Sequence, residues 1–456
     1  MGILITLLTA LFCCYYIINI FLIFSAVLSI ENELKQPDSR NLDSFPHVTI
    51  VIPAYNEEHD IVNTVHTILQ QKYANFALVV VNDGSKDDTL QKLIREFKLE
   101  KTPLKYKDYI KTKTIVAMYC NPSNSRLRVL DKENGGKSDA INAGLNVATE
   151  SEYVCVIDAD VTLENNALYY VVQPIVQRRM ENVVATGGNI RIGIGSEITN
   201  GNVCKLATPG SLLILMQILE YVRSFSLFRL GWNSSNAVPL LSGAFGVFKR
   251  SDIMNSGGYQ KFSKGEDMEI ILRLHERYLT KKENYRIVQL VRPLCFTGAP
   301  SNINELAGQR TRWHIGLLSG LKVYSHMIFR PRYGVLGMVS LPYLLVFEAI
   351  SPILEILGYL FIAVNFFVFH QSSDMFVWFL LSIIGGSLFV NLAAIMTEAL
   401  IMRLYTRPTD LLKLLLVGIL EPLGYHQLNQ YWKIKATFQY YMNIHLKSTW
   451  QPPKRD

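Results

Sequence analysis

The sequence predicts an α/β domain with a mostly parallel, Rossmann-like sheet, accompanied by membrane helices toward both ends of the chain. Three observations lead to this prediction. Short, β-branched apolar runs alternate with helix-like stretches after residue 46, residues 1–30 carry no charged side chain, and the chain turns strongly hydrophobic from Val335. Alternating strands and helices are typical of βαβ units. An apolar stretch of about 20 residues is long enough to span a bilayer.

Residues 1–30 are predicted to form a retained transmembrane anchor. A cleaved signal peptide is the alternative, but the chain has no basic start, and the apolar run is longer than the roughly 7–15 residues of a signal core. Residues 31–45 are polar, contain Pro37 and have the composition of a linker.

The α/β domain is placed at residues 46–310. The predicted strands are 48–52, 77–81, 115–120 and 153–157, and the predicted helices are 58–72, 87–99 and 138–148. Ligands of open α/β sheets collect at the carboxyl ends of the strands, so polar residues at those ends are candidate site residues.

Two apolar segments with embedded charges are predicted to lie in the membrane interface. Residues 211–228 carry Glu220 and Arg223, and residues 304–327 have apolar side chains at helical spacing; the interface helix proper is assigned to 311–332. Ordinary core helices are the alternative, which periodicity alone does not exclude.

Residues 333–430 are predicted to form transmembrane or re-entrant helices. The stretches 337–368 and 376–400 are long enough to span, whereas 411–423 ends in a Glu-Pro break and fits a re-entrant segment or interface hairpin. Glu348 and Glu355 lie seven residues apart in the first stretch. Carboxylates are costly there, so either a polar channel or paired hydrogen bonds between helices would account for them.

The tail at 431–456 is basic and favours a cytoplasmic C-terminus by the positive-inside bias; its cations are Lys433, Lys435, Lys447, Lys454 and Arg455. With one anchor before it, the α/β domain would also face the cytoplasm. The expected location is the cell membrane, with several spans.

Composition supports a membrane component and excludes some partners. Hydrophobic residues make up 49% of the 456, and the formal net charge is +7. Because no Lys/Arg block is interleaved with aromatic residues, nucleic-acid binding is not expected; an anionic membrane surface or an anionic ligand accounts for the charge. The six cysteines are scattered without a Cys-x-x-Cys pair, which argues against zinc and against a disulfide framework.

Two carboxylates, Asp158 and Asp160, follow the predicted strand at 153–157. Paired hard oxygen ligands suit Mg²⁺ or Mn²⁺, which neutralises phosphate charge. Taken alone, such a pair is more often a solvated turn.

Further chemistry-bearing residues follow the other strands. Tyr55 and Glu57 follow the first strand, where an aromatic ring and a carboxylate can hold a base and a ribose, and Asp83 follows the second. Lys137 stands in an Asn-Gly-Gly-Lys-Ser loop, whose glycines let N–H groups approach phosphate. This loop lacks the spacing of a Walker motif.

Downstream, Glu266 and Asp267 precede an amphipathic helix, and a Gln-Arg-Thr-Arg-Trp run follows at 309–313. In this order, Asp83, Asp158-Ala-Asp160, Glu266-Asp267 and Gln309-x-x-Arg312-Trp313 resemble the processive glycosyltransferases of family 2, namely the cellulose, chitin, hyaluronan and poly-N-acetylglucosamine synthases. The resemblance covers the whole chain. Residues 216–223 and 241–246 look like the interface helix and acceptor-site strand of the poly-N-acetylglucosamine branch.

The resemblance implies a glycosyltransferase A-type fold, a UDP-sugar donor, a divalent cation (Mg²⁺ or Mn²⁺) and an inverting reaction. It implies that Asp83 contacts the uridine, Asp158 the nucleotide and Asp160 the metal. It implies that Lys137 lies near the donor and that Asp267 is the general base. The residue pattern after the first strand assigns Tyr55 and Glu57 to the nucleotide side. Glu266, Gln309, Arg312 and Trp313 would hold the acceptor and the pyrophosphate.

The leading hypothesis is a membrane enzyme that elongates a β-linked polymer of hexose or N-acetylhexosamine and passes it through its own spans. The alternative is a non-processive transferase that adds one sugar to a lipid or an oligosaccharide. A transporter or receptor with a binding module is disfavoured because no paired halves are visible. The expected partners are a UDP-sugar, a saccharide or glycolipid acceptor and the bilayer. Sugar identity, linkage and any accessory membrane subunit are left open.

Overall fold

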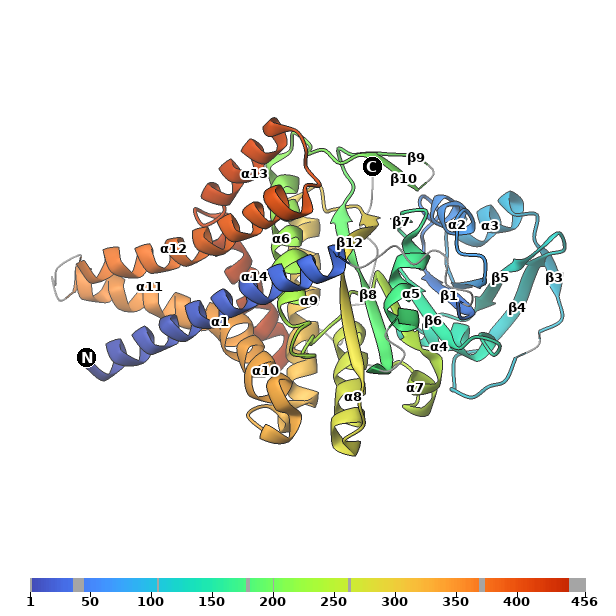
Figure 1. Ribbon diagram of the computed structural model, residues 1–456, viewed down its shortest axis with the longest axis horizontal. Helices are drawn as coiled ribbons and strands as arrows, with labels where there is room; N and C mark the ends of the chain where they lie inside the picture. The colour runs from blue at the N-terminus through green and yellow to red at the C-terminus, as the bar shows by residue number, and fades with distance from the viewer. Residues whose placement is uncertain are drawn as a thin grey trace. The chain divides into compact units, whose positions relative to one another are not determined.

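The computed structural model describes residues 2–35, 45–104, 106–177, 181–199, 201–260, 264–368 and 374–442 (Figure 1). Within these residues the chain forms two compact units that interleave along the sequence. The α/β unit comprises Lys35–Lys205 and Val238–Gly298, and the helical unit comprises Met1–Leu34, Leu206–Ala237 and Ala299–Thr449. Most of the predicted linker (36–44) and the end of the predicted tail (443–456) lie outside the described residues. The domain boundaries proposed from the sequence stay predictions.

The α/β unit is built on a mixed sheet whose order, over the described residues, is β3-β4-β5-β2-β1-β6-β11-β8-β12-β7. Its strands are β1 (Val48–Ala54), β2 (Phe76–Asn82), β3 (Glu100–Thr102), β4 (Ile115–Asn121), β5 (Asn124–Lys132), β6 (Tyr153–Ile157), β7 (Val161–Leu163), β8 (Val183–Ile192), β11 (Phe245–Lys249) and β12 (Arg286–Thr297). The four neighbouring strands β5, β2, β1 and β6 are parallel. A separate small sheet pairs β9 (Glu197–Thr199) with β10 (Asn202–Lys205).

The predicted α/β class is confirmed, and each predicted strand and helix of the unit is present. The four strands are β1, β2, β4 and β6, and the helices are α2 (Ile61–Leu69), α3 (Thr89–Glu96) and α4 (Lys137–Val147). The predicted strand β4 does not join the parallel part of the sheet. It runs antiparallel to β5, and β5 is the strand that pairs with β2.

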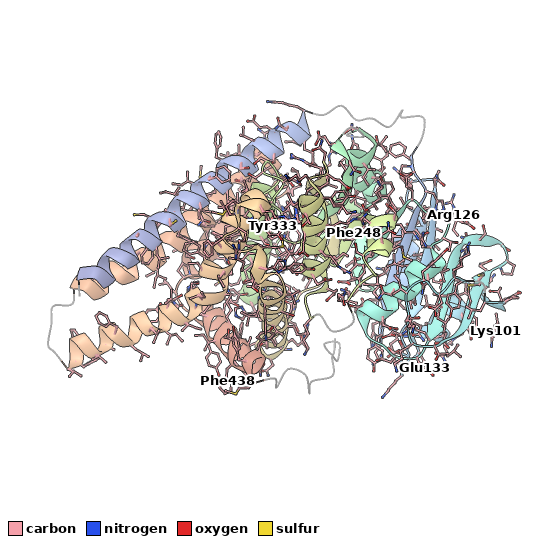
Figure 2. The ribbon with its side chains drawn as sticks, turned by 90° about the horizontal axis from the view of Figure 1, so that it is seen from below. Lys101, Arg126, Glu133, Phe248, Tyr333 and Phe438 are labelled. Atoms are coloured by element: carbon pink, nitrogen blue, oxygen red, sulfur yellow. The ribbon has the colours of Figure 1, made fainter. Side chains whose placement is uncertain are left out.

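The core of this unit is formed by the middle strands and the helices that cover them: α4, α5 (Ala167–Gln177), α7 (Arg250–Asn255) and α8 (Glu266–Lys281). All five residues of β6 are buried, and so is every residue of α4 after Lys137. Helix α4 packs closely on β1, because a Cβ at Gly144 would lie 2.4 Å from Cγ1 of Val51. The edge strand β3 is polar instead. Figure 2 shows Lys101 on β3 at this edge of the sheet, where charge discourages pairing with another chain.

The helical unit contains three helices long and apolar enough to cross a membrane, counted over its described residues. They are Ala10–Leu34, Leu336–Phe361 and Leu381–Met402. These agree with the anchor and the first two predicted spans, whereas the third predicted stretch forms the shorter α13 (Pro408–Leu420).

The remaining elements of the helical unit are α1 (Gly2–Leu34), α6 (Leu212–Arg223) with the π-helix η2 (Ser224–Arg229), α9 (Ile303–Val323), η3 (Ser325–Met327), η4 (Pro331–Tyr333), η5 (Leu336–Ser340), α10 (Leu341–Tyr343), η6 (Leu344–Ile350), α11 (Ser351–Phe367), α12 (Asp374–Met396), η7 (Thr397–Met402) and α14 (Tyr425–Tyr441).

Both carboxylates of the first C-terminal apolar segment are paired by helix α14. Glu348 accepts a hydrogen bond from Nζ of Lys433 at 2.8 Å. Glu355 lies 3.0 Å from Nε2 of His426 and accepts from Nε2 of Gln430 at 2.6 Å. The structure therefore favours paired hydrogen bonds between helices over a channel as the account of these groups. Lys433, which the sequence analysis assigned to a tail, lies within α14.

Candidate active site

The carboxyl ends of three parallel strands carry the predicted site residues of the α/β unit. Strand β1 ends just before Tyr55, β2 just before Asp83 and β6 just before Asp158. Because β2, β1 and β6 are neighbours and run parallel, these ends lie along one edge of the sheet. Asp158 and Asp160 are both partly exposed there, although β6 itself is fully buried. Both carboxylates therefore lie at the carboxyl end of a buried strand, where candidate site residues are expected.

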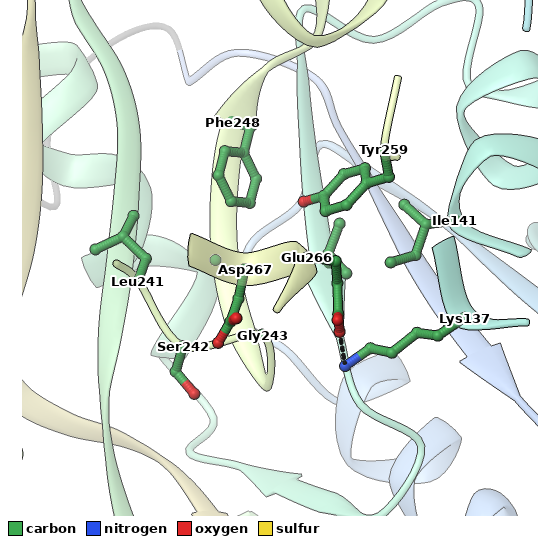
Figure 3. Close-up of a pocket in the computed structure, with 11 residues that line it drawn as sticks. Lys137, Ile141, Leu241, Ser242, Gly243, Phe248, Tyr259, Glu266 and Asp267 are labelled. Carbon is green, nitrogen blue, oxygen red and sulfur yellow. Dashed lines mark ion pairs between the residues drawn. The ribbon is translucent and has the colours of Figure 1, made fainter. Parts of the chain in front are cut away.

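Lys137, the first residue of α4, joins two of the predicted acidic residues. Its Nζ lies 2.7 Å from Oδ1 of Asp158 and 3.1 Å from Oε1 of Glu266, the first residue of α8 (Figure 3). We call Lys137, Asp158 and Glu266 the open cluster, because its side chains are 36%, 31% and 17% exposed. It brings together residues more than a hundred positions apart in the sequence.

In the open cluster one lysine is held between two carboxylates, and each group shifts the pKa of the others. Burial raises the pKa of Asp158 to about 6; the charge on Lys137 opposes this effect and that on Asp160 adds to it. Burial acts to lower the pKa of Lys137, but the carboxylates of Asp158 and Glu266 outweigh it and hold that pKa well above its ordinary value. Lys137 is thus a fixed positive charge, and it lies beside the carboxylates that would face a metal and a nucleotide.

Asp267 lies next to the open cluster and lines the same pocket as Lys137, Ser242 and Gly243. Its Oδ1 accepts a hydrogen bond from the backbone N–H of Met268 at 2.9 Å. At Gly243 the backbone approaches the site closely, since a Cβ there would lie 3.3 Å from Nζ of Lys137 and 3.5 Å from Cβ of Asp267. The segment expected to form an acceptor-site strand therefore borders the predicted base.

Asp83 lies deeper than the sequence suggested and is 2% exposed. Its carboxylate accepts hydrogen bonds from Nζ of Lys132 at 2.6 Å and from the backbone N–H groups of Gly135 (3.0 Å) and Gly136 (2.7 Å). The N–H groups of Gly135 and Gly136 were expected to bind phosphate. In this structure they donate to the Asp83 carboxylate instead. Burial raises the pKa of Asp83, and the ion pair with Lys132 opposes that shift.

Lys132 and Asp139 complete a second cluster that the sequence did not reveal. Nζ of Lys132 also lies 2.8 Å from Oδ1 of Asp139, and both side chains are almost fully buried. We call Lys132, Asp83 and Asp139 the closed cluster. It encloses the glycine loop between β5 and α4 and so fixes the point at which Lys137 begins its helix. No motif marked Lys132, because a lysine at the end of a strand is ordinarily solvated.

The loops after β1 and β2 are tied together. The left-handed residue Asn56 (φ 57) donates its N–H to Oγ of Ser85 at 3.0 Å and accepts from the N–H of Lys86 at 2.8 Å. The backbone N–H of Glu57 donates to Oγ1 of Thr89 at 2.9 Å. Tyr55 and Glu57 therefore lie in a loop at the end of β1 that hydrogen bonds hold to the loop after β2. Their role in nucleotide binding stays a prediction.

Gln309, Arg312 and Trp313 lie on α9 of the helical unit. Arg310, which the sequence analysis left unassigned, stacks 4.3 Å from the Trp313 ring centroid and donates a hydrogen bond to Oε1 of Gln309 at 2.6 Å. The Arg310 guanidinium also pairs with Glu220 of α6. The Arg310 guanidinium thus contacts two motif residues at once, Gln309 and Trp313, and restricts their positions.

The donor set at the end of β6 fits a divalent cation that arrives with a phosphate-bearing ligand. Among the described residues there is no group of three or more His, Cys, Asp or Glu side chains that could hold a metal by itself. Mg²⁺ commonly keeps several waters and is bound through one or two carboxylates plus substrate phosphates. Asp158 and Asp160 supply such carboxylates, beside a cation suited to the same phosphates.

Comparison with known proteins identifies the family. Residues 49–109 and 107–216 match the model described as glycosyl transferase family 2, and residues 199–397 match that of glycosyl transferase family group 2. The poly-beta-1,6-N-acetyl-D-glucosamine synthase of Staphylococcus aureus (strain COL) is 27% identical over 321 residues, which are 70% of this chain and 65% of that protein. The Staphylococcus epidermidis synthase of the same name is 24% identical over 368 residues, 77% of this chain and 74% of that protein.

Among solved structures, the mannosyltransferase PcManGT from Pyrobaculum calidifontis, in complex with GDP-Man and Mn²⁺, superposes with a TM-score of 0.49 at 17% identity, over 95% of this chain and 99% of that one. The match to the S. aureus relative spans just under two thirds of that protein's length. The two family models together cover the α/β unit and much of the helical unit. The chain therefore belongs to glycosyl transferase family 2.

Proposed function

We propose that this chain is a membrane-embedded, inverting glycosyltransferase that moves a hexose or N-acetylhexosamine from a UDP-sugar to a growing β-linked polysaccharide. The observation that carries the proposal is the open cluster. Lys137 links Asp158 at the end of β6 to Glu266, and Asp267 lines the same pocket. Positive charge for a leaving group and a carboxylate for a nucleophile are thus available at one site.

The donor side of the proposed reaction is served by Lys137, Asp158 and Asp160. Lys137 would place its ammonium on the pyrophosphate, where it opposes the negative charge that builds up as the bond to the sugar breaks. Asp158 would contact the nucleotide, and Asp160 would hold Mg²⁺ or Mn²⁺. When bound, that cation neutralises phosphate charge and so favours departure of UDP.

The acceptor side is served by Asp267. Its carboxylate would take the proton of an acceptor hydroxyl while the hydroxyl oxygen forms a bond to the anomeric carbon from the face opposite UDP. The bond between that carbon and the pyrophosphate oxygen breaks, and UDP leaves with the electron pair. A single displacement of this kind inverts the anomeric configuration and needs one base. Two carboxylates line the pocket; Glu266 is paired with Lys137, and we assign the base to Asp267.

Polymer formation and export are proposed from the helical unit and from the relatives. The described residues include three helices able to cross a membrane, and the staphylococcal relatives are named as synthases of a β-1,6-linked polymer. The proposal includes a cytoplasmic α/β unit, following the charge bias of the C-terminal segment. The small number of span candidates favours the alternative, a transferase that adds one sugar to a lipid or oligosaccharide. Product length separates the two.

A UDP-release assay on the purified full chain in nanodiscs tests the proposal. The chain would receive a panel of UDP-sugars with Mg²⁺ or Mn²⁺, followed by sizing of the products. UDP release with products many sugars long is expected. Products with a single added sugar would support the non-processive transferase instead. Asp267→Asn should lower the turnover by at least about 100-fold. Glu276→Gln on the same helix α8, outside the pocket lining, should not. Equal activity in the wild type and Asp267→Asn would contradict the assignment of the base.

Asp160→Asn tests the metal site separately. If Asp160 holds the cation, this variant should need a higher concentration of Mn²⁺ for half-maximal UDP release than the wild type. An unchanged Mn²⁺ dependence would remove Asp160 from the metal site.

A further inference from the structure

Three helices of the helical unit meet at one carboxylate, that of Glu220 on α6. The Glu220 side chain is 18% exposed and pairs with the Arg310 guanidinium of α9. It also accepts hydrogen bonds from the hydroxyl of Tyr425, the first residue of α14, at 3.0 Å and from Nδ2 of Asn429, about one turn later, at 3.3 Å. One carboxylate thus joins α6 to a segment 90 positions later and to another 205 positions later.

Arg310 connects this carboxylate to the predicted acceptor motif. One terminal nitrogen of the guanidinium pairs with Glu220, the other donates to Oε1 of Gln309 at 2.6 Å, and the group lies 4.3 Å from the ring centroid of Trp313. Tyr221, the next residue of α6, also lies near that ring, with centroids 6.3 Å apart. Trp313 is nevertheless 50% exposed. Part of its ring is therefore held by the protein, and part is open to a ligand.

A purely structural ion pair is the simplest alternative account of Glu220 and Arg310. Burial acts to lower the pKa of Arg310, but the Glu220 carboxylate outweighs this effect and raises that pKa, so the guanidinium stays charged. A buried pair of this kind is weak evidence for stability, because apolar side chains of similar volume often hold helices together as well. Apolar side chains do not fix the orientation of a planar group, however. Nε of Arg310 is buried and has no hydrogen-bond partner among the described residues, so the contacts of the two terminal nitrogens set the orientation of the guanidinium.

These contacts make the position of the Trp313 ring depend on Glu220. On the basis of the proposed function, in which Gln309 and Trp313 hold the acceptor, we propose that Glu220 is a positioning residue for acceptor binding. Its carboxylate, held by α14, orients the Arg310 guanidinium, and the guanidinium orients the Gln309 amide and the Trp313 ring. Glu220 takes no part in donor binding. Without its carboxylate, the acceptor sugar binds more weakly, and a growing chain dissociates more often between additions.

Glu220→Gln tests this role because it removes the charge and keeps the size of the side chain. The purified full chain in nanodiscs would be assayed for UDP release with UDP-N-acetylglucosamine and with oligosaccharides of β-1,6-linked N-acetylglucosamine, the repeat named for the staphylococcal relatives. KM for the oligosaccharide should rise about 10-fold, the cost of a misplaced binding group, whereas KM for UDP-N-acetylglucosamine should stay within about 2-fold of the wild type. The products should also become shorter.

Arg310→Lys separates orientation from ion pairing. Lysine keeps a positive charge beside Glu220 but lacks the planar fork that contacts Gln309 and Trp313 together. If only the ion pair mattered, this variant would have the wild-type KM for the oligosaccharide, whereas positioning predicts the same rise as in Glu220→Gln. If Glu220→Gln does not fold, Arg310→Lys alone decides between the two accounts.

Asp410→Asn is the matched control, because Asp410 is likewise a buried carboxylate of the helical unit that ties two segments together, accepting from Oγ1 of Thr208 at 2.5 Å. It should leave both KM values unchanged, and thermal unfolding of each variant shows which of them are folded. An equal rise in the control, equal rises in the two KM values, or a wild-type KM for the oligosaccharide in folded Glu220→Gln or Arg310→Lys overturns the positioning role. If the wild type releases UDP from no UDP-sugar, the proposed function itself fails, which is a distinct result.

Discussion

Two lysines five residues apart, Lys132 and Lys137, each lie between two carboxylates, yet their surroundings are opposite. In the closed cluster the Lys132 side chain is 0% exposed, and its two partners are 3% and 1% exposed. In the open cluster the Lys137 side chain is 36% exposed. The ion-pair distances are similar, at 2.6 and 2.8 Å against 2.7 and 3.1 Å. Geometry alone therefore does not distinguish the two; burial does.

Burial decides what each cluster can do. A charge that is fully buried must stay paired, because losing its partner leaves an uncompensated charge in a medium of low dielectric constant. A pair open to solvent is cheap to separate. The closed cluster can therefore serve only as a scaffold for the glycine loop, whereas Lys137 can exchange a carboxylate for the phosphate of a ligand.

The largest effect should come from Lys132→Met. The substitution leaves Asp83 and Asp139 buried without their cation, which should lower the free energy of unfolding by about 3–5 kcal/mol. Chemical or thermal unfolding of the purified chain, followed by intrinsic fluorescence, measures this. Adding Asp83→Asn and Asp139→Asn to the same chain should recover part of the loss, because the buried charges are then removed. A fully stable Lys132→Met variant would show that the closed cluster is not a scaffold.

Lys137→Met should have the opposite effect: a large loss of activity and little loss of stability. It removes the cation expected on the leaving group, so turnover in the UDP-release assay should fall by about 100-fold, equivalent to about 2.7 kcal/mol in the barrier. The free energy of unfolding should change by less than about 1 kcal/mol, since the pair is partly solvated. Lys92→Met, at an exposed pair with Glu58, is the control and should change neither quantity. A loss of stability like that of Lys132→Met would erase the distinction between the clusters.

The sequence predicted the open cluster better than the closed one for a physical reason. Strands β2 and β6 are short apolar runs, so their ends could be located. The end of β6 marked Asp158 of the open cluster, and the end of β2 marked only Asp83 of the closed cluster. Strand β5 escaped because its first residues, Asn124 to Arg126, are polar and partly exposed. Lys132 ends that strand, so its partnership with Asp83 could not be seen either.

Contacts between distant segments were equally beyond the sequence. Arg310 stood inside a recognisable motif, but its pairing with Glu220 depends on how α6 and α9 pack. No motif marked Tyr259, and only its neighbours in the structure show that it lines the pocket. The candidate spans were predictable because length and composition alone define them. The partners of Glu348 and Glu355 were not, because they come from α14.

A smaller effect on stability is expected from the titration of a buried histidine, His275. His275 is fully buried; its Nε2–H donates to the carbonyl of Val238 at 2.9 Å, and its Nδ1 accepts from the Tyr285 hydroxyl at 2.5 Å. Burial lowers the pKa of His275 to about 4, and the bond to Val238 opposes that shift. The unfolded chain, with a histidine pKa near 6.5, then binds more protons than the folded chain between pH 6.5 and pH 4.

The stabilisation from neutral His275 is therefore complete above pH 6.5 and lost as the pH falls toward 4. Between pH 6 and pH 5 it should contribute up to about 1.4 kcal/mol to the decrease in the free energy of unfolding. Unfolding curves of the wild type and His275→Gln measure the difference in slope. If His275→Gln retained the wild-type slope, the buried imidazole would not be the group that titrates.

The smallest effect is expected at the exposed pair of His66 and Glu96, whose atoms are 2.9 Å apart and whose side chains are 45% and 49% exposed. The distance is no longer than that between Lys137 and Glu266, so a count of ion pairs would rank the two together. Water screens this pair on both sides, and Glu96→Gln should change the free energy of unfolding by less than about 0.5 kcal/mol. Unfolding curves of Glu96→Gln and Lys132→Met, measured under the same conditions, would give the smallest and the largest expected changes in the free energy of unfolding. An effect above about 1 kcal/mol would mean that pairing, rather than burial, separates the scaffold from the site.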